Sequence, residues 1–184
     1  MTDLRQRKKL LQVARDSLAW GINKGVSKPV DVEQFESELQ QPAACFVTLH
    51  RNDQLRGCIG SLEARRPLVE DVSKNAFAAG FQDPRFPALQ EYELDQLDLS
   101  ISVLTPAQEM HFTSQQDLIK QLKPGIDGLI LEEGQRRGTF LPSVWEQLPD
   151  PEQFLHHLKL KAGLPVDYWS DKLRVFRYTT ESFE

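Results

Sequence analysis

The sequence predicts an α+β fold in which antiparallel β-sheets are flanked by helices. Two β-hairpin patterns support this class, at residues 44–61 and at residues 128–141. Two helical patterns, at residues 4–21 and 68–80, supply flanking elements. With 184 residues, of which 40% are hydrophobic, residues 1–184 are predicted to form a single globular domain, with two lobes.

The first predicted element is an amphipathic helix from Leu4 to Gly21. Leu10, Ala14 and Leu18 recur at intervals of four residues, which places them on one face. The basic start of this helix is interpreted as a solvated face, because the apolar stripe already accounts for the helix. The polar segment at residues 27–41 is predicted to be a loop with at most a short helix.

The hairpin at residues 44–61 contains the most distinctive stretch, Leu55-Arg56-Gly57-Cys58-Ile59-Gly60. A two-residue turn at Asn52 and Asp53 would fix the register of its two strands. The facing pairs, all on one side of the sheet, would then be Val47 with Cys58, Leu49 with Arg56, and Cys45 with Gly60. A disulfide between the two cysteines fits this register, but a reducing cytoplasm disfavours it.

Cys58 is the first candidate catalytic residue. A thiolate is the nucleophilic form of cysteine, and the guanidinium of Arg56 is expected to stabilise it. The alternative is that Cys58 is a small buried hydrophobe, as most free cysteines are. A catalytic pair of Cys58 with His50 or His111 is a weak signal, because the chain has four scattered histidines.

Two glycines in the same stretch, Gly57 and Gly60, interrupt a strand that would otherwise pack through side chains. Glycine in a strand suggests a bulge, a bend or a close approach of another backbone. A ligand could therefore come near the backbone here, and both glycines are candidate substrate-binding residues.

A second helix is predicted to open at Arg66-Pro67-Leu68 and to end at Gly80, because proline suits a first helical position. Its Leu68, Val72 and Ala76 follow at core spacing. Asn75 is a weak helix former, so it either faces outward or contacts neighbouring backbone.

The segment at residues 81–89 is predicted to be an irregular loop. Its prolines, Pro84 and Pro87, favour extended conformations in the residues that precede them. Asp83 and Arg85 flank the first proline, so this stiff loop is the second candidate site. The alternative is a structural ion pair that ties the loop down.

The rest of the chain contains shorter patterns. The predicted elements are a strand at residues 97–103, a helix at 114–122, a short helix from Pro142, a helix from Asp150 to Gly163, and a strand at 172–179. His156 and His157 are adjacent on a helix and point about 100° apart, so they cannot both face one metal ion. No metal site is predicted.

The composition excludes several classes of function. No phosphate-binding loop, dinucleotide fingerprint, zinc-protease motif or nucleophile elbow is present. The net charge of −5 disfavours broad nucleic-acid binding, including a local RNA or nucleotide site at Arg56, Arg85 and Arg137. No membrane span or signal peptide is apparent, so a cytoplasmic location is expected.

The stretch from Leu55 to Gly60 resembles the signature motif of the AMMECR1 family, and the resemblance covers nearly the whole chain. It continues through Asn75-Ala76, Asp83-Pro84-Arg85-Phe86, Ile101-Ser102-Val103-Leu104, Gly125-Ile126-Asp127-Gly128, Thr139-Phe140-Leu141-Pro142 and Phe154 to Gly163. The chain looks most like the prokaryotic form called AmmeMemoRadiSam system protein A. The resemblance implies an α+β fold, with a larger lobe that holds both termini and a smaller lobe. It also implies a Memo-like protein and a radical S-adenosylmethionine protein as partners.

Two functions follow as hypotheses. The first is an enzyme or enzyme component in which Cys58 is the nucleophile or covalent attachment point and Arg56 stabilises its thiolate or an anionic substrate. In it Asp83 and Arg85 complete the pocket, with Asn75, Gly57 and Gly60 as further substrate-binding residues. The second is a non-catalytic adaptor for the same two partners, with the arginine-rich cleft as its docking surface and Cys58 as filler. No cofactor is expected in the chain itself.

Overall fold

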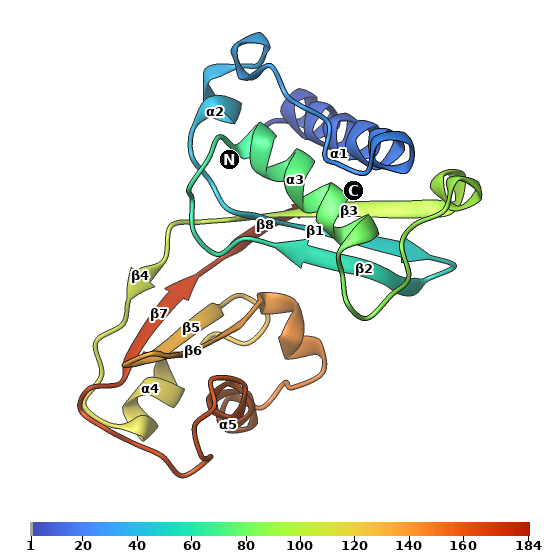
Figure 1. The fold of residues 1–184 in the computed structure, drawn as a ribbon. Helices are drawn as coiled ribbons and strands as arrows, with labels where there is room; N and C mark the ends of the chain where they lie inside the picture. Colours follow the sequence, from blue (N-terminus) through green and yellow to red (C-terminus); the bar gives the residue numbers. More distant parts are fainter. Residues whose placement is uncertain (1) are drawn as a thin grey trace. The chain divides into compact units, whose positions relative to one another are not determined.

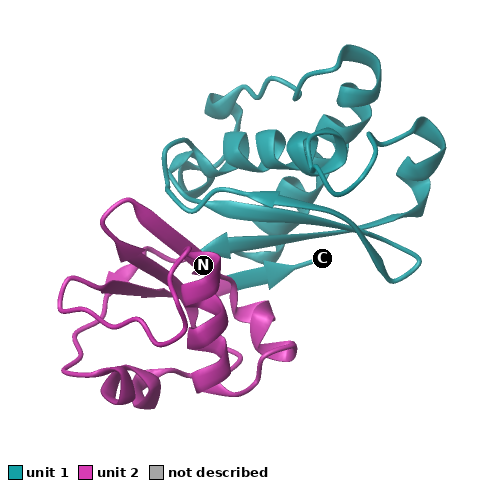
Figure 2. Cartoon of the chain, turned by 60° about the horizontal axis from the view of Figure 1, so that its bottom comes forward, with its two compact units in different colours: residues 1–104, 181–184 teal, residues 105–180 magenta. Residues whose placement is uncertain are grey.

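The structure is a computed structural model that describes residues 2–184. It confirms the α+β class, because two four-stranded antiparallel sheets have helices beside them. The chain divides into two compact units, drawn in different colours in Figure 2. Unit 1 comprises the residues up to Leu104 and residues 181–184, and unit 2 comprises residues 105–180.

Helix α1 (Leu4–Lys24) confirms the first predicted element and runs one turn further than expected. Asp3 and Gln6 form a reciprocal cap at its start, in which each side chain accepts the other residue's backbone N–H at 2.8 and 2.9 Å. The helix continues past Gly21 and ends at Gly25, whose φ of 69° is the left-handed conformation that glycine accepts. The predicted apolar stripe is buried.

The hairpin consists of β1 (Cys45–Arg51) and β2 (Gln54–Gly60). Its two-residue turn is confirmed, since Asn52 and Asp53 both have positive φ values, 52° and 59°. The first two pairs next to the turn are in the expected register. Arg56 is then an extra residue, because Leu55 pairs with His50 whereas Gly57 pairs with Leu49.

This β-bulge makes the predicted register wrong beyond Leu55. Cys58 pairs with Thr48 instead of Val47, and Val47 pairs with Ile59. A shift of one residue turns every following side chain to the other face of a sheet. Cys58 and Cys45 consequently face opposite sides of the sheet, and both are free thiols.

Unit 1 is completed by α3 (Leu68–Phe81), β3 (Leu97–Leu104) and β8 (Thr180–Phe183, all but its first residue), with strand order β2-β1-β3-β8. Figure 1 shows α1 and α3 on one face of this sheet. The sequence predicted α3 and β3 within a residue or two, but it did not predict β8. The short elements are η1 (Val32–Gln34), α2 (Ser37–Gln40) and η2 (Glu91–Gln96).

The core of unit 1 lies between these helices and the sheet. Alternate residues of β1 and β3 point into it, as the predicted strand pattern requires. Its fully buried members include Leu10, Ala14, Val47, Leu49, Val72, Ala76 and Ile101.

Unit 2 contains the second sheet, with strand order β4-β7-β5-β6. Its strands are β4 (Gln108–Glu109), β5 (Gly128–Glu133), β6 (Arg136–Phe140) and β7 (Arg174–Tyr178). Its helices are α4 (Gln115–Gln121), η3 (Pro142–Glu146) and α5 (Pro151–Lys161). Trp145 stacks on Phe154 with ring centroids 3.7 Å apart, and both side chains are buried in the core of this unit.

The chain enters and leaves unit 2 through neighbouring residues. The N–H of Thr105 donates to the carbonyl of Thr179 at 2.9 Å, and the N–H of Thr179 donates to Oγ1 of Thr105 at 2.9 Å. Among residues 2–184, no helix has both the length and the apolar character that crossing a bilayer requires.

Candidate functional site

Cys58 lies on the edge strand β2 of the first sheet and is partly exposed. The bulge at Arg56 turns its side chain to the face that also carries Thr48. Oγ1 of Thr48 lies 3.2 Å from Sγ of Cys58, which is hydrogen-bond range for sulfur. Within residues 2–184, the hydrogen-bond partner of this thiol is therefore a hydroxyl and not a histidine base.

Asp83 and Arg85 bind the outer edge of β2 at Cys58. Oδ2 of Asp83 accepts the Cys58 N–H at 2.9 Å, and Nη2 of Arg85 donates to the Cys58 carbonyl at 3.3 Å. These are the two groups that another strand would otherwise bind. The loop thus protects the sheet edge and fixes the backbone that carries the thiol.

Asp83 and Arg85 also bind each other, as the structural alternative predicted. Nε and Nη2 of Arg85 donate to the two carboxylate oxygens at 2.9 and 2.7 Å. Asp83 is buried, and the guanidinium beside it holds the pKa of this carboxyl well below its usual range. The side chain of Arg85 is still 53% exposed, and no acceptor among the described residues binds its Nη1.

Arg56 does not contact the thiol, so its predicted position beside Cys58 is wrong. Its Nε and Nη2 donate to both oxygens of Glu93 at 2.8 and 3.0 Å. Arg51 shares the same carboxylate through a bond of 3.2 Å. Because Glu93 is almost fully buried, this cluster fixes the bulge to the segment that follows α3.

Asn75 belongs to a separate buried cluster, in which it contacts backbone, one of its two predicted alternatives. Its amide donates to the Cys45 carbonyl at 3.0 Å and to Oδ2 of Asp71 at 2.9 Å. Oδ2 of Asp71 also accepts the Cys45 N–H at 3.0 Å. Burial, with the Asp71 carboxylate alongside, raises the pKa of the Cys45 thiol well above its ordinary value.

The two glycines of the motif pack against the protein's own atoms. A Cβ on Gly57 would lie 2.1 Å from the carbonyl oxygen of Ala79 in α3. A Cβ on Gly60 would lie 2.3 Å from the ring of Phe46. The close approach predicted from these glycines is therefore present, but its partners are a helix and a ring. The space that the sequence analysis assigned to a ligand is filled at both positions.

The structure thus brings together three of the predicted site residues, Cys58, Asp83 and Arg85. It places Arg56 and Asn75 in other clusters. Thr48 and Glu93 could not be predicted as neighbours of the motif. The contact of Thr48 with Cys58 depends on the strand register, and Glu93 is far from Arg56 along the chain. The remaining arrangement is a thiol beside a hydroxyl, with a half-exposed guanidinium fixed against the same backbone. It can present a nucleophile to an electrophile that has a negative charge.

Comparisons with known proteins agree with this fold. The AMMECR1 family profile matches residues 11–183. Protein MJ0810 of Methanocaldococcus jannaschii is 37% identical over 161 residues, covering 85% of this chain and 80% of the relative. A Thermococcus onnurineus protein is 42% identical over 186 residues, covering 95% and 88%. The crystal structure of uncharacterized protein PH0010 from Pyrococcus horikoshii has a TM-score of 0.86 and 34% identity, over 96% of this chain and 89% of that one. The chain therefore belongs to the AMMECR1 family.

Proposed function

We propose that this protein is an enzyme or enzyme component in which Cys58 is the reacting group. In this proposal it is an AmmeMemoRadiSam system protein A, which works in the cytoplasm with a Memo-like protein and a radical S-adenosylmethionine protein. The observation that supports the proposal is the partly exposed thiol of Cys58, whose own backbone carbonyl accepts a hydrogen bond from the half-exposed guanidinium of Arg85. Sγ of Cys58 would attack an electrophilic carbon, forming an S–C bond while the leaving group departs with the bonding electrons and the thiol proton passes to solvent. Arg85 takes the role of binding an anionic substrate that the sequence analysis assigned to Arg56.

Asp83 acts in this proposal as a positioning residue. It binds the Cys58 N–H and holds Arg85 through two further bonds, so it links the thiol backbone to the guanidinium. A fixed geometry of this kind lowers the ordering cost that a substrate would otherwise meet on binding.

Alkylation of the native protein tests the proposal. We expect iodoacetamide to modify Cys58 and to leave Cys45 untouched, because Cys45 is fully buried and its pKa is raised. Iodoacetate has a negative charge, so the preference for iodoacetate is the ratio of its alkylation rate to that of iodoacetamide at the same thiol. This ratio should be several-fold higher at Cys58 than at free glutathione, and added salt should reduce it. Peptide mass spectrometry separates the two cysteines.

The test variant is Arg85→Gln and its matched control is Arg15→Gln; each substitution removes one positive charge. Arg15 is exposed on α1 and belongs to no part of the candidate site. Arg85→Gln should bring the preference for iodoacetate down to the glutathione value, whereas Arg15→Gln should leave it unchanged. A Cys58 that resists both reagents in the folded protein would refute a reactive thiol.

A second candidate function is the adaptor, and one surface favours it. Tyr92 is 66% exposed, and the guanidinium of Arg51 lies 5.6 Å from its ring centroid. Tyrosine and arginine are the residues that protein interfaces favour as hot spots. If the protein is an adaptor, the Cys58→Ala variant should still co-purify with the two partners. The Tyr92→Ala variant should bind them at least about tenfold more weakly. Loss of the complex in Cys58→Ala alone would favour the enzyme.

A further inference from the structure

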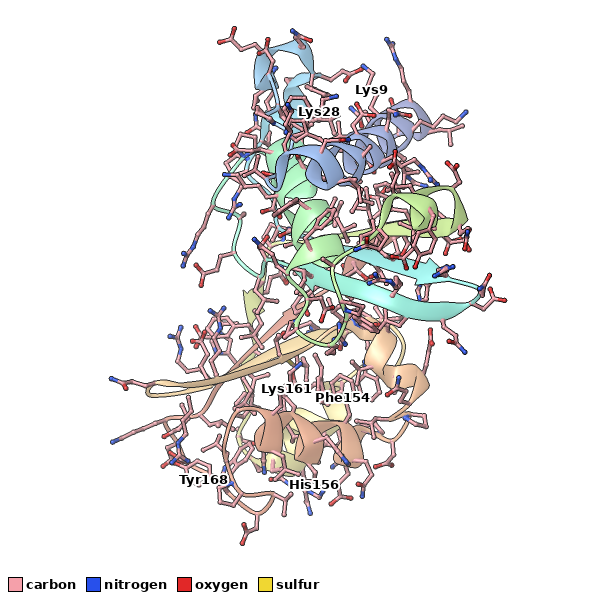
Figure 3. The ribbon with its side chains drawn as sticks, turned by 45° about the vertical axis from the view of Figure 1, so that its right-hand side comes forward. Lys9, Lys28, Phe154, His156, Lys161 and Tyr168 are labelled. Carbon is pink, nitrogen blue, oxygen red and sulfur yellow. The ribbon has the colours of Figure 1, made fainter. Side chains whose placement is uncertain are left out.

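A cavity of about 250 Å³ lies in unit 1, and its lining residues are different from those of the Cys58 site. It is formed by α1, the loop that follows α1, the end of η1 and one residue of α3. Its principal lining residues are Val13, Asp16, Lys28, Val30, Asp31 and Phe35. Figure 3 labels Lys28 near α1. The volume is below the roughly 300–1,000 Å³ of pockets for drug-sized ligands, so it suits a small molecule.

Two buried hydroxyls hold the backbone of Lys28 in place. Oγ of Ser17 accepts the Lys28 N–H at 3.1 Å, and Oγ of Ser73 donates to the Lys28 carbonyl at 2.7 Å. The Ser17 hydroxyl in turn donates to the Ser73 carbonyl at 2.8 Å. Since both serines are buried on α1 and α3, the cavity wall is fixed before any ligand arrives.

The charges that face the cavity are unequal. Nζ of Lys28 binds Oδ2 of Asp16 at 2.7 Å, so these two charges compensate each other. Asp31 has no cation within ion-pair distance among the described residues; its Oδ2 accepts only the neutral amide of Gln34, at 2.8 Å. One negative charge therefore remains uncompensated among the lining residues.

Part of the lining is apolar. Val13, Val30 and Phe35 are half-buried and pack against the core of unit 1, while their remaining surface lines the cavity. A ligand that fits must combine an aliphatic body, which these side chains would remove from water, with a positive charge for Asp31.

We propose that this cavity is a binding site for a small aliphatic ammonium ion. The ammonium group donates to the free carboxylate oxygen of Asp31, and the aliphatic chain lies against Val13, Val30 and Phe35. Free amines and amino acids share this chemistry. The site is independent of the reaction proposed at Cys58.

Isopentylamine is the probe, and its binding can be followed through the backbone amide NMR signals of the whole chain. We expect saturable shifts confined to residues near Lys28 and Asp31 at millimolar concentration. Isopentanol and 4-methylpentanoate have similar bodies without the positive charge, and they should bind at least about tenfold more weakly. Leucine distinguishes the two ligand sources: it binds comparably if amino acids are accepted, and more weakly if free amines are preferred.

Two variants and a control test the charge argument. Asp31→Asn should weaken isopentylamine binding about tenfold, because it removes the uncompensated carboxylate. Lys28→Gln removes the competing ammonium from Asp16 and should strengthen binding several-fold. The control Glu38→Gln removes one exposed charge outside the cavity and should change nothing. Equal shifts with all probes, or no saturable shift with isopentylamine, would overturn the proposal.

Discussion

The free energy of unfolding of the Glu93→Gln variant is expected to be about 3 kcal/mol lower than that of the wild type at neutral pH. Glu93 accepts two bonds from Arg56 and one from Arg51, and its carboxylate also accepts the N–H of Gln90. The side chain of Arg56 is only 11% exposed, and its Nη1 already has no hydrogen-bond partner among the described residues. A neutral amide would leave this guanidinium charge buried without compensation.

The stability that the variant loses should be smaller at acidic pH than at neutral pH. The bond to Arg56 holds the pKa of Glu93 below its ordinary value. The carboxylate therefore contributes stability that is present above the pKa of the unfolded chain, about 4.3, and is lost as the pH falls through the lower pKa of the folded protein. The gap between wild type and variant should narrow on acidification.

Urea unfolding followed at several pH values measures this gap. Glu91→Gln is the control, because Glu91 lies in the same short helix but is exposed. Its effect should stay within about 0.5 kcal/mol. A Glu93→Gln variant as stable as this control would show that the Arg56 cluster does not hold the bulge in place.

The Gly57→Ala substitution is expected to lower the free energy of unfolding by about 3 kcal/mol or more, which is the upper end of the effects of overpacking. The added Cβ would lie 2.1 Å from the carbonyl oxygen and 3.0 Å from the carbonyl carbon of Ala79. Both atoms belong to the backbone of α3, so relief requires the helix to move away from β2. Calorimetry or urea unfolding measures the loss.

Gly25→Ala serves as the comparison for this substitution. Gly25 has open space around it, so its alanine variant meets only the cost of a positive φ, about 1 kcal/mol. If Gly57→Ala costs no more than Gly25→Ala, the close approach of α3 to β2 is not a constraint on the fold.

Local patterns predicted most of the elements because their causes are local. Four-residue apolar spacing predicted α1, apart from its last turn, and alternation of apolar and polar residues predicted β3. The turn at Asn52 and Asp53 was also predicted from its residue types. Each of these signals acts over a few residues, so a single sequence contains it in full.

The register of β2 could not be obtained in this way. The bulge at Arg56 is fixed by Glu93, which is distant in the sequence and supplies the partner of the extra residue. For the same reason the prediction placed Arg56 beside the thiol, whereas in the structure Arg56 binds Glu93. Asp83 and Arg85 were found because Pro84 stiffens a short loop, which is again a local cause.

Strand β8 has a consequence for how the chain folds during synthesis. Every residue of unit 2 leaves the ribosome before residue 181 does, whereas β3 must wait for β8 to cover its outer edge. The nascent sheet of unit 1 therefore keeps an unprotected strand while the whole of unit 2 is being translated. Such a strand is a template for pairing with another chain, so a slow or stalled ribosome would expose this protein to aggregation at β3.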